Sequence, residues 1–133
     1  MSRKSKGINA ERELIHMFWG TGTWVAARCA GSGSMVYPSP DIIASNGKNT
    51  LAIECKSSKS NYIYLTKKEI EELKKFSEMF NAHPLIGVRF SRKDWSFLNL
   101  TDLKETEKNF VVSLDAAEKK GSNFIELLEN PLR

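Results

Sequence analysis

Residues 41–56 read as a β-hairpin, and no other feature of the sequence constrains the fold as strongly. Residues 41–45 and 50–56 are rich in strand-forming side chains, and residues 46–49, Asn-Gly-Lys-Asn, are typical of a tight turn. Just before the hairpin, Pro38 and Pro40 hold the preceding residues in extended conformations. The chain is therefore expected to build a sheet around this hairpin.

The hairpin carries charged side chains that ordinary packing would not place there. Asp41 stands at the head of one strand, while Glu54 and Lys56 share a face of the other, because strand side chains alternate. Folding the hairpin brings Asp41 towards Glu54, and two nearby carboxylates repel each other unless one is protonated or a cation lies between them. Oxygen ligands suit Mg²⁺ or Mn²⁺. The pattern indicates a divalent metal site beside a lysine, with a plain cross-strand ion pair as the alternative.

The remaining segments alternate between helical and strand patterns. The clearest helix covers residues 66–82, where Thr66 and Glu69 form a capping box ahead of apolar residues at helical spacing. Further helices are expected over residues 9–19, capped by Asn9, and 123–129. Further strands are expected over residues 23–29, 85–90, 95–100 and 110–114. The sum predicts a single α/β domain over residues 1–133, with a central mixed β-sheet flanked by helices and a basic N-terminal arm at about residues 1–7.

The first helix places an acid among apolar residues. Leu14, Ile15 and Phe18 form one stripe, and Glu11 lies on the same side of the helix. An unpaired carboxylate on an inward-facing stripe is costly, so a partner for Glu11 is expected. The alternative is an acid near the start of a helix that is favoured by the helix dipole.

The charge balance favours an anionic partner. The chain has 20 Lys and Arg against 16 Asp and Glu, a formal net charge of +4. Arg3, Lys4 and Lys6 precede the first acid, and a solvated tail is the alternative explanation for them.

The sequence argues against a membrane or secreted protein. No apolar run reaches membrane-spanning length, and the N-terminus is polar and basic. Cys29 and Cys55 are the only cysteines and cannot build a disulfide framework. A cytoplasmic, reducing location is expected.

The spacing of Pro40-Asp41, a dozen residues, and then Glu54-Cys55-Lys56 resembles the signature of the PD-(D/E)xK nuclease superfamily. Other segments sharpen the resemblance to one of its branches, the archaeal Holliday junction resolvase family. These segments agree in order and spacing and are Lys6-Gly7, residues 10–14, Arg28, residues 31–34, residues 40–44 and residues 52–56.

The resemblance implies a restriction-endonuclease-like nuclease fold and a metal-dependent active site. The implied catalytic residues are Glu11, Ser32, Asp41, Glu54 and Lys56. The implied ligands of Mg²⁺, with Mn²⁺ as a possibility, are Glu11, Asp41, Glu54 and the backbone carbonyl of Cys55. Whether Lys56 orients the attacking water or deprotonates it stays open.

Basic residues along the chain are candidates for phosphate contacts, and Arg12 and Arg28 match family positions with that role. The predicted DNA-binding set is Arg3, Lys4, Lys6, Arg12, Arg28, Lys59 and Arg89. Ser32 lies in the glycine-containing segment 31–34, which is either a lid over the scissile phosphate or a plain connector.

The substrate implied by the resemblance is a four-way DNA junction. Its two-fold symmetry calls for a C2 homodimer that presents two active sites. Phe76, Met79 and Phe80 could form the dimer surface, unless this stripe packs on its own sheet. The alternatives are another repair or restriction-type endonuclease of the superfamily, or a non-catalytic DNA-binding module of the same fold. The intact set of Glu11, Asp41, Glu54 and Lys56 argues against the non-catalytic module.

Overall fold

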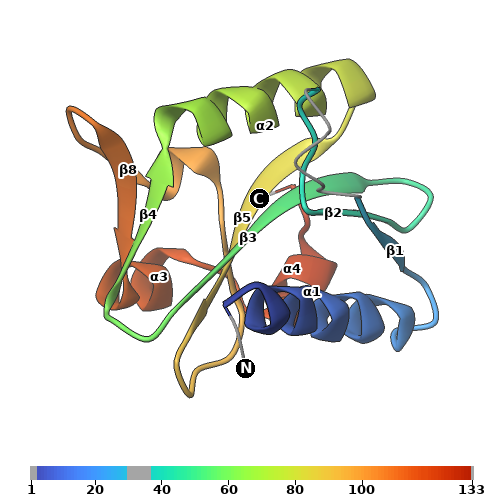
Figure 1. The fold of residues 1–133 in the computed structure, drawn as a ribbon. Coiled ribbons are helices and arrows are strands. Elements are labelled where there is room, and N and C mark those ends of the chain that lie inside the picture. The colour runs from blue at the N-terminus through green and yellow to red at the C-terminus, as the bar shows by residue number, and fades with distance from the viewer. Residues whose placement is uncertain (1–2, 30–36, 133) are drawn as a thin grey trace.

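A five-stranded mixed sheet lies at the centre of the computed structural model, which describes residues 3–29 and 37–132 (Figure 1). Its strand order is β1-β2-β3-β5-β6. The neighbouring strands β3 and β5 are parallel, and the other pairs are antiparallel. The strands are β1 (Val25–Arg28), β2 (Ile42–Ser45), β3 (Thr50–Ser58), β5 (His83–Phe90) and β6 (Ser96–Leu98). The expectation of a central mixed sheet flanked by helices is confirmed.

The β2–β3 hairpin is the one that the turn sequence predicts. Ser45 pairs with Thr50, and the Asn46 side chain accepts hydrogen bonds from the backbone N–H groups of Lys48 and Asn49 at 2.9 and 2.8 Å. Gly47 has a φ of 91°, a left-handed conformation that glycine adopts without steric cost. Local sequence therefore determines this turn.

A second, three-stranded sheet stands beside the first. Its order is β4-β8-β7, with β4 (Tyr62–Thr66), β7 (Lys104–Glu105) and β8 (Asn109–Ser113). β8 was expected from the sequence, whereas β4 and β7 were not. β4 does alternate, since Ile63 and Leu65 are buried while Tyr62 and Tyr64 are exposed. That alternation is the strand signal in this segment.

The helix α2 (Lys67–Phe80) has the predicted capping box. The Thr66 hydroxyl accepts a hydrogen bond from the Glu69 backbone N–H at 3.0 Å, and the Glu69 carboxylate accepts one from the Thr66 N–H at 2.9 Å. The expected C-terminal helix is also present as α4 (Phe124–Glu129). Between them, α3 (Leu114–Lys120) and the short 3-10 helix η1 (Leu100–Asp102) were not expected.

The helix α1 (Arg3–Trp19) begins earlier than the sequence indicates. The predicted start at Asn9 is wrong, because a residue type that favours the cap position does not by itself begin a helix. The residues before Asn9 include Lys and Arg, which propagate a helix well, and no proline. The backbone of the basic segment from Arg3 onwards thus belongs to α1, while the side chains at positions 3–6 and 8 lie outside the description.

Helices cover both faces of the main sheet, and each face has its own apolar core. On one face, Leu14 and Phe18 of α1 and Leu127 of α4 pack against the sheet residues Leu51 and Ile53. The opposite face is packed by Ile70 and Leu73 of α2, together with residues of the second sheet. Figure 1 shows α1 and α2 on opposite sides of β3 and β5. None of the helices in the described part of the chain is long and apolar enough to cross a bilayer.

Candidate active site

The candidate site lies where β3 extends beyond β2. Ile42 pairs with Ile53, so β3 pairs only with β5 from that point to its end at Ser58. The backbone N–H of Cys55 consequently has no strand partner on the β2 side and donates a 2.8 Å hydrogen bond to the Asp41 carboxylate. This bond fixes the side chain of Asp41 at the end of the hairpin.

Asp41 and Glu54 form a carboxyl pair. Burial, followed by the negative charge of Asp41, raises the pKa of Glu54 to about 8. Burial also raises the pKa of Asp41, while the hydrogen bonds from the Cys55 N–H and the Glu54 side chain work against that rise. At neutral pH Glu54 therefore retains a proton, which it shares with Asp41. The structure brings together the two acids that the hairpin spacing placed near each other.

Glu11 reaches the same site from α1, which packs on the face of the sheet opposite α2. Its carboxylate faces Arg28 of β1 at 3.7 Å and is largely shielded from solvent. Burial and the charge of Asp41 raise the pKa of Glu11, whereas Arg28 lowers it. The partner expected for this acid is thus Arg28, and Arg28 is held near the site by the same contact.

The carboxylate oxygens of the site are suitable ligands for a hard divalent cation, although the three acids do not surround a common position. Within residues 3–29 and 37–132, no three acidic, histidine or cysteine side chains stand close enough together to hold a metal ion. Glu11 is turned to Arg28, and Asp41 and Glu54 share a proton. A cation can replace a proton that two buried carboxylates share, and carboxylate oxygens are the donors that Mg²⁺ and Mn²⁺ prefer. The oxygens of the Asp41–Glu54 pair therefore suit such an ion.

Lys56 lies on the α2 side of the sheet, on the same face of β3 as Glu54. Its ammonium is 2.5 Å from the carboxylate of Glu69 at the start of α2. Burial alone would lower the pKa of Lys56, but the hydrogen bond and charge of Glu69, with the charges of Glu54 and Asp41, raise it. Glu69 has a lowered pKa despite its burial, because Lys56 and the Thr66 N–H stabilise its charge. Lys56 is therefore a charged, oriented group.

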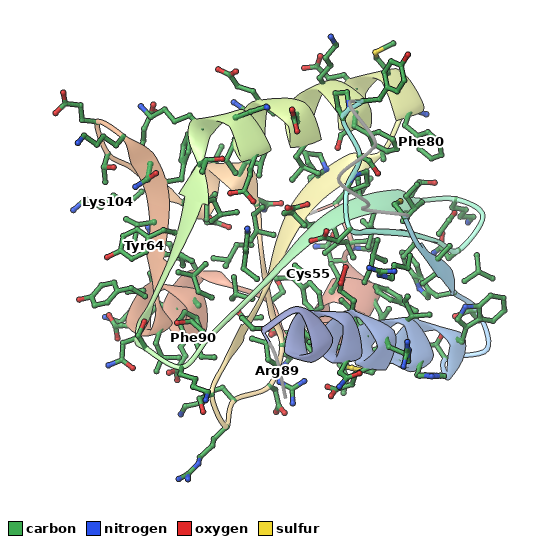
Figure 2. The ribbon with its side chains drawn as sticks, in the orientation of Figure 1. Cys55, Tyr64, Phe80, Arg89, Phe90 and Lys104 are labelled. Carbon is green, nitrogen blue, oxygen red and sulfur yellow. The ribbon has the colours of Figure 1, made fainter. Side chains whose placement is uncertain are left out.

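The acids Glu11, Asp41 and Glu54 line one groove together with Lys56, and its volume is about 860 Å³. Figure 2 shows Cys55 on β3 between α1 and α2, with Arg89 and Phe90 below it. The groove is lined by Gly7, Ala10 and Glu11 of α1, by Asp41, by residues 54–59, and by residues 89–92. Lys59 and Arg92 contribute positive charge to its wall. A groove with acids at its centre and cations at its margin suits an anionic polymer.

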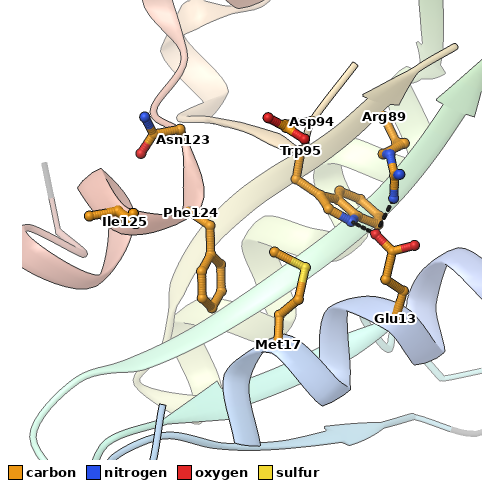
Figure 3. A pocket seen from close by; sticks show the side chains of 8 residues that line it. All are labelled: Glu13, Met17, Arg89, Asp94, Trp95, Asn123, Phe124 and Ile125. Atoms are coloured by element: carbon orange, nitrogen blue, oxygen red, sulfur yellow. Dashed lines mark hydrogen bonds and ion pairs between the residues drawn. The ribbon is translucent and has the colours of Figure 1, made fainter. Parts of the chain in front are cut away.

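Arg89 lines both the groove and a second pocket, and neighbouring residues engage its side chain (Figure 3). It forms an ion pair with Glu13, donates a 2.9 Å hydrogen bond to the Lys93 carbonyl, and lies over the Trp95 ring at 5.8 Å. Trp95 also donates to Glu13 at 3.3 Å, in the wall of a pocket of about 350 Å³ that Met17 and Phe124 help to line. Arg89 thus ties α1 to the β5–β6 turn, and its predicted contact with phosphate remains a prediction.

Some predicted site residues lie outside this geometry. Ser32 falls in the segment 30–36, which lies outside the described residues, as do the side chains of Arg3, Lys4 and Lys6. Arg12 is exposed on α1.

Comparison with known proteins identifies the family. A model of the family described as archaeal Holliday junction resolvase (Hjc) matches residues 2–132. The chain belongs to the archaeal Holliday junction resolvase family. The resemblance seen in the sequence is therefore confirmed.

Named members of the resolvase family align with most of the chain. The crossover junction endodeoxyribonuclease Hjc of Archaeoglobus fulgidus is 40% identical over 130 residues, which cover 92% of this chain and 95% of that protein. The crossover junction endodeoxyribonuclease Hje of Saccharolobus solfataricus is 35% identical over 112 residues, or 82% of this chain and 79% of that protein. A solved structure of Hjc from A. fulgidus superposes with a TM-score of 0.84 at 35% identity, covering 91% of this chain and 98% of that one. The expected nuclease fold is thereby confirmed.

Sequence reasoning missed two residues of the site. Glu69 was recognised only as a helix cap, because its contact with Lys56 depends on where α2 packs. Arg92 lies between the expected strands 85–90 and 95–100, but only the parallel pairing of β3 with β5, which sets Ser58 opposite Phe90, brings that segment to the groove. No local signal in the sequence could have placed either residue.

Proposed function

We propose that this chain is a structure-selective endonuclease that resolves four-way DNA junctions by paired, symmetric, metal-dependent cuts. Family membership and relatives named as crossover junction endodeoxyribonucleases support this function. The observation that carries it is the buried Asp41–Glu54 carboxyl pair, with a charged Lys56 beside it, in one groove. An enzyme of this kind acts inside the cell, in the cytoplasm with the chromosome.

The site chemistry suits phosphodiester hydrolysis. Asp41, Glu54, Glu11 and the Cys55 carbonyl would hold Mg²⁺ or Mn²⁺. A divalent ion bound there supplies water activation and offsets the charge that develops on the phosphate. Lys56 is held as an ammonium by Glu69, and an ammonium donates hydrogen bonds but cannot accept a proton. We therefore assign Lys56 the orientation of the attacking water rather than its deprotonation.

Strand-by-strand mapping of cleavage products tests the proposed substrate. A synthetic four-way junction is incubated with the protein and Mg²⁺, beside a linear duplex of the same sequence. Paired cuts at symmetry-related positions of the junction, with the duplex left intact, would support a resolvase. Equal cutting of both DNAs would instead favour another repair or restriction-type nuclease. Binding without any cutting would favour the non-catalytic module.

We propose further that the enzyme is a homodimer that pairs through α2. Met79 is 81% exposed, and Phe80, which lies at the end of α2 (Figure 2), is 52% exposed. Phe80 stacks on the half-buried Phe76 with ring centroids 5.1 Å apart. Phe76 therefore packs against the core beneath α2, whereas Met79 and Phe80 remain exposed for contact with a second copy. A two-fold substrate needs two active sites related by the same symmetry.

The mass of the protein in solution tests this surface. Phe80→Glu should convert a dimer to a monomer in light scattering after size exclusion, because it places a charge in an apolar contact. Ile125→Glu is the matched control, since Ile125 is 66% exposed on α4, away from α2. A wild-type protein that runs as a monomer at all concentrations would contradict the proposal.

A further inference from the structure

The ion pair between Lys56 and Glu69 joins the candidate catalytic lysine to the start of α2. The Lys56 ammonium and the Glu69 carboxylate are 2.5 Å apart, and the two side chains are only 30% and 27% exposed. Shielding from water strengthens such a contact relative to an exposed ion pair. The pair is therefore more than an incidental surface contact.

Glu69 is itself fixed, so it can hold another group in place. One of its carboxylate oxygens accepts the hydrogen bond from the Thr66 backbone, and the other faces Lys56. Its neighbour Ile70 is buried in the core beneath α2. The capping box alone explains why an acid stands at this position, but it uses only one oxygen and does not need a negative charge.

Two sets of acids compete for the Lys56 ammonium. Glu69 stands on α2, while Asp41 and Glu54 stand on the hairpin, with Glu54 on the same face of β3 as Lys56. In this structure Lys56 forms an ion pair with Glu69, and the hairpin acids hydrogen-bond to each other. Without Glu69, the flexible lysine would be attracted to the carboxyl pair and would occupy the space between the acids and the groove.

We propose that Glu69 is a positioning residue, which holds the Lys56 ammonium on the α2 side of the groove so that it faces the Asp41–Glu54 pair without neutralising it. The inference rests on the proposed nuclease function, since it assigns a role within the same site. Glu69 acts through Lys56 and does not touch the reacting phosphate.

Glu69→Gln separates this role from helix capping. Glutamine has the same length and serves equally well in a capping box, so α2 keeps its start, but the ion pair is lost. At saturating junction and Mg²⁺, the single-turnover rate should fall about tenfold or more, because a misplaced group can cost on the order of 10²-fold. Junction affinity and melting temperature should stay as in the wild type. A wild-type maximal rate in Glu69→Gln would overturn the proposal.

Two further variants show whether stability or the ion pair determines the rate. Thr66→Ala removes the hydroxyl that caps α2 but leaves the Glu69 carboxylate, so it should lower the melting temperature and preserve the maximal rate. Glu105→Gln removes a 3.0 Å ion pair with Lys67, the residue that follows Thr66. This pair lies outside the groove, so the variant should preserve both the melting temperature and the maximal rate. A Thr66→Ala rate as slow as that of Glu69→Gln would assign the effect to the cap and overturn the proposal.

The position of Lys56 can also be measured without any cutting. Limited acetylation of the metal-free protein, followed by peptide mass spectrometry, reports how freely each lysine amine reacts. Glu69→Gln should speed labelling of Lys56 and leave Lys67 unchanged, whereas Glu105→Gln should speed labelling of Lys67 alone. Equal labelling of Lys56 in the wild type and Glu69→Gln would overturn the proposed restraint. If the wild type fails to cut junctions, the proposed function fails, while this measurement still decides whether Glu69 holds Lys56.

Discussion

At the residue scale, the Glu54 carboxyl keeps its proton at pH values at which an exposed glutamate has lost it. Burial and the charge of Asp41 raise its pKa from 4.5 to about 8 in the folded state. Between these values the folded protein binds more protons than the unfolded chain, so stability falls as pH rises. The contribution is fully present below the unfolded pKa and is lost as the pH passes through the folded one.

This titration predicts a pH-dependent difference between the wild type and Glu54→Gln. In denaturant unfolding with EDTA, the wild type should lose stability relative to the variant as pH rises from about 5 to about 8, and the difference should level off above that range. The variant keeps a neutral side chain at all pH values and so lacks this component. A difference that is constant from pH 5 to 9 would show that Glu54 does not hold a proton in the fold.

The residues of the hairpin could be predicted from the sequence because strand alternation and a short turn determine which side chains meet. Asp41 and Glu54 are brought together by pairing within 14 residues of chain. Glu69 could not be predicted as a partner of Lys56, since its position depends on how α2 packs on the sheet. Local periodicity carries no information about such a contact.

At the element scale, α3 is fixed against β6 at Gly121. A Cβ on Gly121 would lie 2.6 Å from the Ala117 carbonyl oxygen and 2.1 Å from the Ser96 hydroxyl, which itself donates to that carbonyl. The backbone there also pairs Phe97 with Ser122. The end of α3 therefore has no room for a side chain.

Gly121→Ala should accordingly lower the free energy of unfolding by about 1–3 kcal/mol, as overpacking typically does. Gly7→Ala is the matched comparison, because a Cβ at Gly7 would meet no atom within 4 Å and the residue lies inside α1. It should be neutral or stabilising by up to about 1 kcal/mol. Denaturant melts of both variants make the comparison, and equal stabilities would contradict the tight packing at Gly121.

Elements with strong local signals could be predicted, and those defined by long-range contacts could not. The capping box gave the start of α2, and the turn sequence gave the β2–β3 hairpin. The start of α1 was placed too late because Asn9 looked like a cap, although the helix continues through it. β7 is only two residues long and is defined by its pairing with β8, so the local sequence does not predict it.

At the scale of the whole molecule, the chain carries a net charge of +4, and four of its basic residues line the groove: Lys56, Lys59, Arg89 and Arg92. Lys59 and Arg92 lie in the groove wall, while Lys119 lies on α3 and pairs with Asp115 at 3.1 Å. Each phosphate that a cation neutralises contributes about −0.9 to the slope of log affinity against log salt on duplex DNA. The groove cations should therefore contribute to this slope and Lys119 should not.

Junction binding by fluorescence anisotropy over a series of salt concentrations checks this expectation. Lys59→Ala and Arg92→Ala should each make the slope shallower by about 0.9, and Lys119→Ala should leave it unchanged. A slope near zero in the wild type would contradict a phosphate-dominated interface. Equal slopes in all three variants would show that the DNA does not follow the groove.

We propose that the Asp41–Glu54 pair is the catalytic centre of a junction-cutting nuclease. Single-turnover cleavage of a synthetic four-way junction with Mg²⁺, measured for the wild type and for Asp41→Ala beside junction affinity, tests it most directly. Asp94→Ala is the control, because Asp94 is an exposed acid that lines the pocket of Figure 3 rather than the groove. If the pair is the catalytic centre, Asp41→Ala should bind the junction and not cut it, while Asp94→Ala should bind and cut like the wild type. Cutting by Asp41→Ala at the wild-type rate would contradict the proposal.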